Sequence, residues 1–166
     1  MTLDIERADE RTMLEAHLEG NRATVVRKCS GLAWTDATRR LGPTPTSIAG
    51  ILKHLVNVER WWFRYNLAGE ADVPFDWTDE DPDLEFEMGP DDSLESLLEA
   101  YQRACDTSRV IAAEHDLEDR AARAWRGGRH PSLRWIYVHM IEELARHNGH
   151  LDMYRELIDG ETDRDL

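Results

Sequence analysis

The chain has 166 residues and a formal net charge of −14, and its 41% hydrophobic residues include six tryptophans. This composition is typical of one packed globular domain of ordinary size, which we expect to span residues 1–166. The summed negative charge repels phosphate backbones and anionic lipid surfaces, so we expect neither a nucleic acid nor a membrane as a partner.

The first periodic segment covers residues 7–28 and has the 3.6-residue repeat of a half-buried helix. Its apolar stripe consists of Leu14, Leu18 and Val25. The charged N-terminal segment does not resemble a signal peptide, and no stretch approaches the roughly 20 apolar residues of a membrane helix. We therefore expect a cytoplasmic protein in which Cys29 and Cys105 are free thiols packed as small apolar residues.

A turn with two prolines at residues 42–46 precedes a second predicted helix, which extends to Gly69. Thr46 or Ser47 can cap its N-terminus through the side-chain oxygen. Spacings of three and four residues define an apolar face that comprises Ile48, Ile51, Leu55, Val58 and Trp62. His54 lies at the margin of this face, so we expect its ring to point toward the core.

The segment 69–92 is aperiodic, rich in acidic residues and interrupted by three prolines. A connection of this length is unusual inside a compact domain. It indicates either a lid or a crossover between helices that are not antiparallel neighbours. We expect Trp77 and Phe86 to anchor it to the rest of the fold.

Two more helices are predicted after this connection. Residues 93–115 carry apolar side chains at near-heptad spacing, and the last helix covers residues 131–158, with Pro131 in its first turn and Gly160 after its end. No segment shows the alternation that would predict a strand. The sequence therefore predicts an all-α fold, a four-helix bundle with a long connection between helices 2 and 3.

The last predicted helix carries the polar residues best placed for chemistry. His147 lies on its apolar stripe, and Glu143, one turn earlier, can direct its carboxylate to the same point. With His54 from the second helix, they form three ligands, the number that a catalytic zinc uses while one position stays open. The same set suits non-haem iron. The alternative is that both histidines are hydrogen-bonded residues of the core.

Other residues on the same helix extend this set. His139 and His150 lie about one turn to either side, and Glu142 precedes Glu143, so these three residues could support the ligands, replace one of them, or face solvent. Gly149 costs roughly 1 kcal/mol relative to alanine inside a helix. It therefore predicts that another helix or a ligand approaches closely at this point.

Three segments are specific in combination, namely LEAHLEGNRATVVRKCSGL, ILKHLVNVERWWFRYNLAG and WIYVHMIEELARHNGHLDMYRELIDG. They resemble the DinB-like superfamily, in the branch related to the mini-circle protein, over nearly the whole chain. The resemblance implies a DinB/YfiT-like four-helix bundle in up-up-down-down order. It also implies a divalent metal held by His54, Glu143 and His147. A carboxylate at position 143 is similar to the bundle domain of mycothiol-dependent maleylpyruvate isomerase.

The same resemblance implies a metal-dependent transferase that acts with a low-molecular-weight thiol of the mycothiol type, since characterised relatives activate such a thiol as a thiolate. Zinc is the expected metal, with nickel or iron as alternatives, and the expected substrate is a small molecule. Related bundles often pair, so a homodimer is expected. A metal-dependent hydrolase and a non-catalytic protein that binds a metal or small molecule are the alternative functions.

Overall fold

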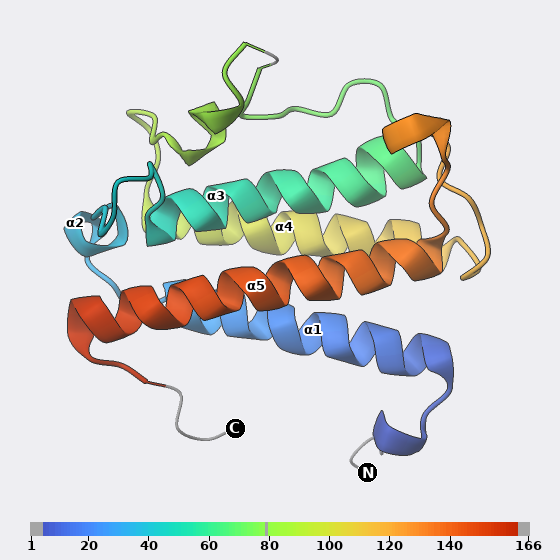
Figure 1. Cartoon of the computed structure of the whole chain (residues 1–166), viewed down its shortest axis with the longest axis horizontal. Helices are drawn as coiled ribbons and strands as arrows, with labels where there is room; N and C mark the ends of the chain where they lie inside the picture. The colour runs from blue at the N-terminus through green and yellow to red at the C-terminus, as the bar shows by residue number, and fades with distance from the viewer. Residues whose placement is uncertain (1–4, 79, 163–166) are drawn as a thin grey trace.

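The computed structural model describes residues 5–78 and 80–162, and within them it contains helices and turns but no strand beyond isolated bridges. The long helices are α1 (Glu10–Cys29), α3 (Ile48–Glu59), α4 (Leu94–Ala113) and α5 (Leu133–Asp159) (Figure 1). The other elements are α2 (Trp34–Ala37), the π-helical η2 (Arg60–Leu67), which continues α3, and the 3-10 turns η1 (Ile5–Arg7), η3 (Pro82–Phe86) and η4 (Arg126–Gly128). The predicted all-α bundle is confirmed, although no sequence pattern indicated α2. Among the described helices, none has the length and apolar character needed to cross a membrane.

Side-chain caps explain where the long helices begin. The capping residues, each of which accepts a hydrogen bond from the backbone N–H three residues later, are Asp9, Ser47, Ser93 and Ser132. Gly160 ends α5 in the left-handed conformation, with φ of 76°. Pro131 precedes the cap of α5, so its predicted place in the first turn of that helix is wrong.

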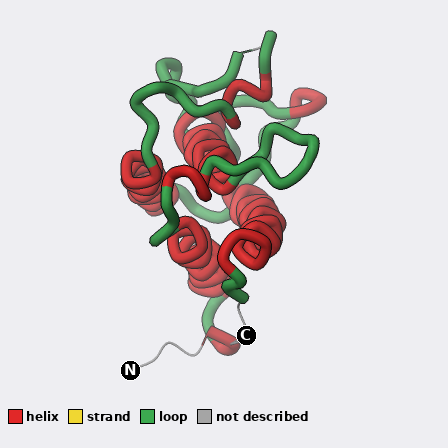
Figure 2. Tube along the Cα trace, turned by 90° about the vertical axis from the view of Figure 1, so that its left-hand side faces the viewer, coloured by secondary structure: helices red, strands yellow, loops and turns green. Residues whose placement is uncertain are grey.

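The bundle consists of two parallel helix pairs, α1 with α5 and α3 with α4. Near the beginnings of their helices, Arg134 of α5 and Glu10 of α1 form an ion pair at 2.7 Å, and near the ends Arg155 donates to the carbonyl oxygen of Lys28 at 2.9 Å. The two pairs run in opposite directions (Figure 1), and Figure 2 views the helices along their axes. The order is therefore up-down-down-up, and the up-up-down-down order implied by the resemblance is wrong.

The parallel orientation of α3 and α4 explains the long connection between them. The chain has to return along the whole length of α3 and η2 before α4 can begin (Figure 1). The predicted crossover between helices that are not antiparallel neighbours is thus confirmed. Both predicted anchors are confirmed too, since Trp77 packs against Trp61 with ring centroids 5.5 Å apart and Phe86 stacks on His54 at 5.1 Å.

Apolar side chains from all four long helices form one core. Its largest fully buried members include Leu18, Leu55, Phe63, Tyr101 and Met140. Within this core, Arg22 and Glu59 form an ion pair at 2.6 Å, and their side chains are 5% and 0% exposed. Cys29 and Cys105 are buried and free, as predicted, and burial raises the pKa of Cys29 to about 12. At neutral pH Cys29 is therefore an uncharged core residue.

Candidate metal centre

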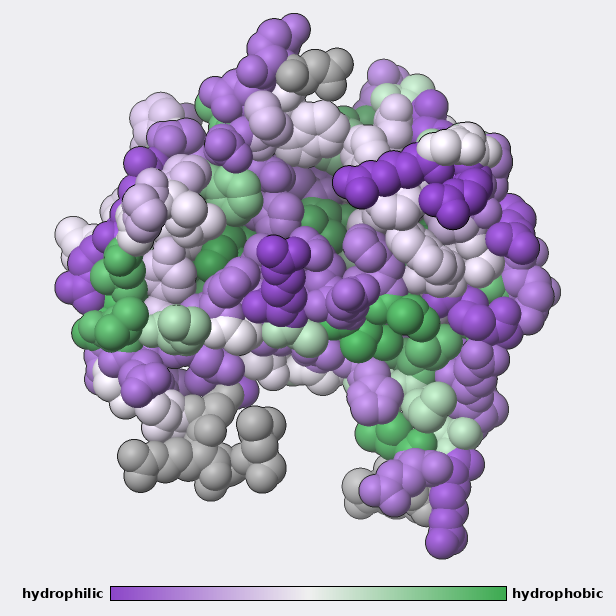
Figure 3. All heavy atoms as spheres, in the orientation of Figure 1, coloured by the Kyte–Doolittle hydropathy of each residue, from purple (hydrophilic) through white to green (hydrophobic). Residues whose placement is uncertain are grey.

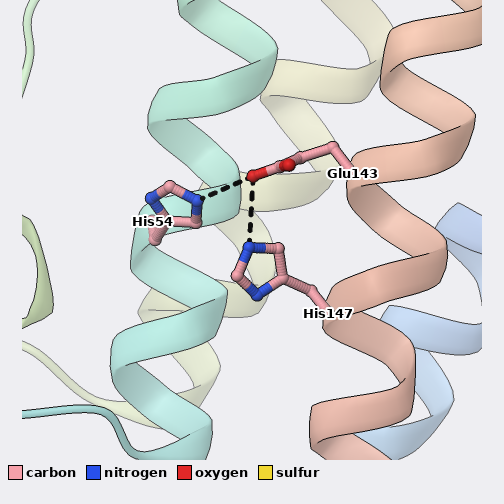
Figure 4. Close-up of side chains that lie close together, drawn as sticks. All are labelled: His54, Glu143 and His147. Carbon is pink, nitrogen blue, oxygen red and sulfur yellow. Dashed lines mark hydrogen bonds and ion pairs between the residues drawn. The ribbon is translucent and has the colours of Figure 1, made fainter. Parts of the chain in front are cut away.

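The side chains of His54, Glu143 and His147 converge in the space between α3 and α5 (Figure 4). His54 Nε2 lies 3.4 Å from Glu143 Oε1, and His147 Nε2 lies 3.2 Å from the same oxygen. One potential ligand atom of each residue lies within 4.8 Å of the other two. The structure thus brings together the three residues that the sequence singled out.

Local geometry accounts for this convergence. Glu143 and His147 are four residues apart on α5, so one helical turn places both side chains on the same side of that helix. The beginning of α3 is held against the end of α5, because the Tyr154 hydroxyl donates to the carbonyl oxygen of Thr46 at 2.9 Å. His54, further along α3, therefore lies opposite Glu143.

The three side chains are shielded from most of the solvent, with exposed fractions of 16% for His54, 22% for Glu143 and 12% for His147. Burial opposes the charged form of His54, but its hydrogen bonds to Glu143 and Glu85 outweigh burial and raise its pKa to about 9. The hydrogen bonds from His147 and His54 hold the pKa of Glu143 well below its usual range. Glu143 is thus ionised at neutral pH and accepts hydrogen bonds from both histidines.

This set of donor atoms fits a divalent transition metal. Two imidazole nitrogens and one carboxylate oxygen are the ligands of many catalytic zinc sites and of non-haem iron sites. His147 Nδ1 is buried and has no hydrogen-bond partner among the described residues. The Nε2 atom of the same ring faces Glu143 and the centre of the cluster, whereas Nδ1 points away (Figure 4), so Nε2 is the nitrogen that would bind a metal.

Glu85 adds a fourth polar side chain to the site, and no sequence pattern singled it out. It lies in η3, within the acidic connection, and its side chain is 13% exposed. Glu85 Oε1 lies 2.9 Å from His54 Nδ1, and its Oε2 accepts a hydrogen bond from Asn57 at 3.2 Å. A carboxylate in this position fixes the tautomer and the ring orientation of a metal-binding histidine.

Gly50 allows the connection to approach α3 closely enough to deliver Glu85. A Cβ atom at this position would lie 3.1 Å from the carbonyl oxygen of Phe86, tighter than normal packing allows. One turn further along α3, the Lys53 ammonium group donates to the carbonyl oxygen of Glu87 at 2.8 Å. Contacts to the backbone of the two residues that follow Glu85 thus hold it against His54.

The other candidates on α5 differ in their relation to this cluster. His139 packs among tryptophan rings, the nearest centroid at 4.7 Å. These tryptophans are Trp62, Trp125 and Trp135. Glu142 is exposed, and so is His150, but the rings of His150 and His147 are in contact with centroids 5.5 Å apart. Of the three, His150 alone has a ring contact with the described cluster.

Gly149 faces open space: it is exposed, and a Cβ atom there would meet no described atom within 4 Å. The predicted close approach of another helix at Gly149 is therefore wrong for the described residues. Because glycine is costly inside a helix, we expect Gly149→Ala to raise the free energy of unfolding by about 0.5–1 kcal/mol in urea denaturation. Gly20→Ala, at an equally open position of α1, is the matched comparison. A loss of stability confined to Gly149→Ala would contradict this expectation.

Fold and site together define a class of protein: an all-α bundle with a potential metal site between its second and its last long helix. The sequence model of the mycothiol-S-transferase family matches residues 13–160, and the chain belongs to this family. The predicted superfamily is thereby confirmed. No curated protein and no solved structure matches the chain.

Proposed function

We propose that this protein is a metal-dependent transferase that acts with a low-molecular-weight thiol of the mycothiol type. The observation that carries the proposal is the convergence of His54, Glu143 and His147, whose potential ligand atoms lie within 4.8 Å of one another. Membership of the mycothiol-S-transferase family supports the thiol and the reaction class. Zinc is the proposed metal, with nickel or iron as alternatives.

The chain's own residues would bind the metal and set the charge around it. When bound by His54, Glu143 and His147, a divalent metal would lower the pKa of a thiol ligand and so supply a nucleophile at neutral pH. The charge of Glu143 offsets part of the metal's charge, and the low exposure of all three side chains strengthens electrostatic interactions in the site. Glu85 accepts the hydrogen bond of His54 Nδ1–H, so His54 would bind a metal through Nε2 after losing the proton from that atom.

Glu85→Gln tests this role of the acidic connection. Loss of the Glu85 carboxylate charge beside His54 Nδ1 is expected to raise the dissociation constant for Zn²⁺ by about 10- to 100-fold, measured by competition with a chromophoric chelator. Glu87→Gln is the control, because Glu87 is an exposed residue of the same connection that pairs with Arg40 and not with the site. Equal affinities of the two variants for Zn²⁺ would argue against a supporting role of Glu85.

Binding of a thiol at the metal is tested with cobalt-substituted protein. Addition of N-acetylcysteine, as a simple thiol probe, is expected to produce an intense sulfur-to-cobalt charge-transfer band in the absorption spectrum. His147→Ala protein, treated with the same cobalt and thiol concentrations, controls for complexes formed in solution. If cobalt binds but no band develops with N-acetylcysteine or with mycothiol, thiol binding at the metal is wrong, and a hydrolase or a non-catalytic binding protein is favoured.

The alternatives have less support from the geometry. A hydrolase needs a general base close to the metal. Of the earlier candidates, His139 packs in the tryptophan cluster, and Glu142 and His150 are both exposed. Only the His150 ring contacts His147, which makes it the remaining candidate. We further propose that the protein is cytoplasmic, that each chain is a single domain and, on the basis of the superfamily resemblance, that two chains form a homodimer. Light scattering would show twice the chain mass for this dimer.

A further inference from the structure

A cavity of about 480 Å³ lies beside the candidate metal centre. It is bounded by the second half of α5, the beginning of α3, the turn before α3 and the ring of Phe86. His147 lines this cavity and also belongs to the candidate metal centre, so the two sites adjoin at its side chain. The volume is in the range of pockets that hold small organic molecules.

The walls of this cavity are mainly apolar, and they come from Leu41, Ile51, Phe86, Met153 and Leu157. Met153 and Leu157 are 62% and 67% exposed, although both are large apolar residues. Figure 3 shows that hydrophobic side chains are visible among hydrophilic ones on the face that carries α5. Apolar groups presented in a concave space favour an apolar ligand.

Arg146 supplies a positive charge at the edge of the same cavity. It is exposed, and within the part of the chain that the structure describes its guanidinium makes no hydrogen bond, ion pair or ring contact. The other two arginines of α5, Arg134 and Arg155, are both paired with carboxylates. In a chain with a net charge of −14, an arginine without a carboxylate partner beside an apolar cavity favours an anionic group of a ligand.

We propose that this cavity binds the second substrate, the compound that receives the thiol, and that this substrate is an apolar molecule with one anionic group bound by Arg146. The inference rests on the proposed transferase function. Arg146 is adjacent to His147, whereas Leu157 lies 11 residues, or about 16 Å, further along α5. The anionic group therefore binds near the metal centre, and the apolar part extends away from it toward Met153 and Leu157.

Two fluorescent probes with the same aromatic rings test the pocket. 8-Anilinonaphthalene-1-sulfonate carries one anionic group, and N-phenyl-1-naphthylamine lacks it. We expect Arg146→Gln to raise the dissociation constant of the sulfonate about tenfold and to leave that of the neutral probe nearly unchanged. Leu157→Ser is expected to raise the dissociation constants of both probes. Arg126→Gln is the matched control, because Arg126 stacks on Trp125 away from this cavity.

The outcomes separate this inference from the proposed function. Three results would each overturn the pocket assignment. These are no binding of the sulfonate, equal affinity of the sulfonate for wild-type and Arg146→Gln protein, or a lower affinity for Arg126→Gln protein instead. Probe binding is measured without thiol and without turnover. A protein that shows the expected Arg146 dependence but no sulfur-to-cobalt band would therefore retain the anion-binding pocket and lose the transferase proposal.

Discussion

His147→Ala is expected to lower the bound metal from about one ion per chain to almost none. His147 supplies one of only three ligands, and alanine leaves a site of two donors, one of them the carboxylate of Glu143. His54→Ala is expected to have the same effect, because its Nε2 atom faces the same carboxylate oxygen. Elemental analysis of protein purified without a polyhistidine tag measures the stoichiometry in both variants.

His17→Ala is the matched control for these variants, since His17 is an exposed histidine of α1 that no contact links to the candidate centre. It should keep the wild-type metal content. Full metal content in His147→Ala or His54→Ala would place the metal elsewhere. If wild-type protein binds no metal after incubation with zinc, nickel and iron, His54, Glu143 and His147 form only a hydrogen-bonded cluster between α3 and α5.

The largest expected effect on stability comes from Glu59→Ala. This substitution leaves the Arg22 guanidinium, 5% exposed, in the core without the carboxylate that now binds it at 2.6 Å and 2.8 Å. Arg22 keeps its ion pair with Glu19 at 2.7 Å, but Glu19 is 42% exposed and does not replace the two bonds that Glu59 makes inside the core. The free energy of unfolding is therefore expected to fall by up to about 3–5 kcal/mol in urea denaturation.

Two comparisons separate this effect from the loss of any ion pair. Glu99→Ala removes an exposed i, i+4 pair with Arg103, which is worth at most about 0.5 kcal/mol. Replacing both Arg22 and Glu59 with methionine removes the two buried charges together, and we expect this variant to recover much of the lost stability. A loss for Glu59→Ala no larger than that for Glu99→Ala would contradict the buried-pair interpretation.

Interactions that are local in sequence made the helices and two of the candidate ligands predictable. The 3.6-residue repeat and the Ser47 cap indicated α3, and the i, i+4 spacing of Glu143 and His147 follows from helical geometry alone. His54 could be added because its position on the apolar face indicated an inward-facing ring. These predictions needed no knowledge of how the helices pack.

Features that depend on tertiary contacts could not be predicted in this way. Glu85 is one of many acidic residues in an aperiodic segment, and it becomes distinctive only when Gly50 and Lys53 bring the connection against α3. The direction of each helix depends on packing between them, which no single repeat encodes. Likewise, two of the three tryptophans around His139, Trp62 in η2 and Trp125 before α5, lie far from it in sequence.

The division of the bundle into two parallel pairs has a consequence for metal occupancy. His54 belongs to the α3–α4 pair, whereas Glu143 and His147 belong to the α1–α5 pair, so a bound ion would act as a cross-link between the two halves. Binding to the folded state alone adds RT ln(1 + [M]/Kd) to the free energy of unfolding. Hydrogen exchange along the facing sides of α3 and α5 should therefore slow as free zinc rises, with less change at α1–α5 contacts. The stability of the contact between the two helix pairs would therefore depend on the concentration of free metal.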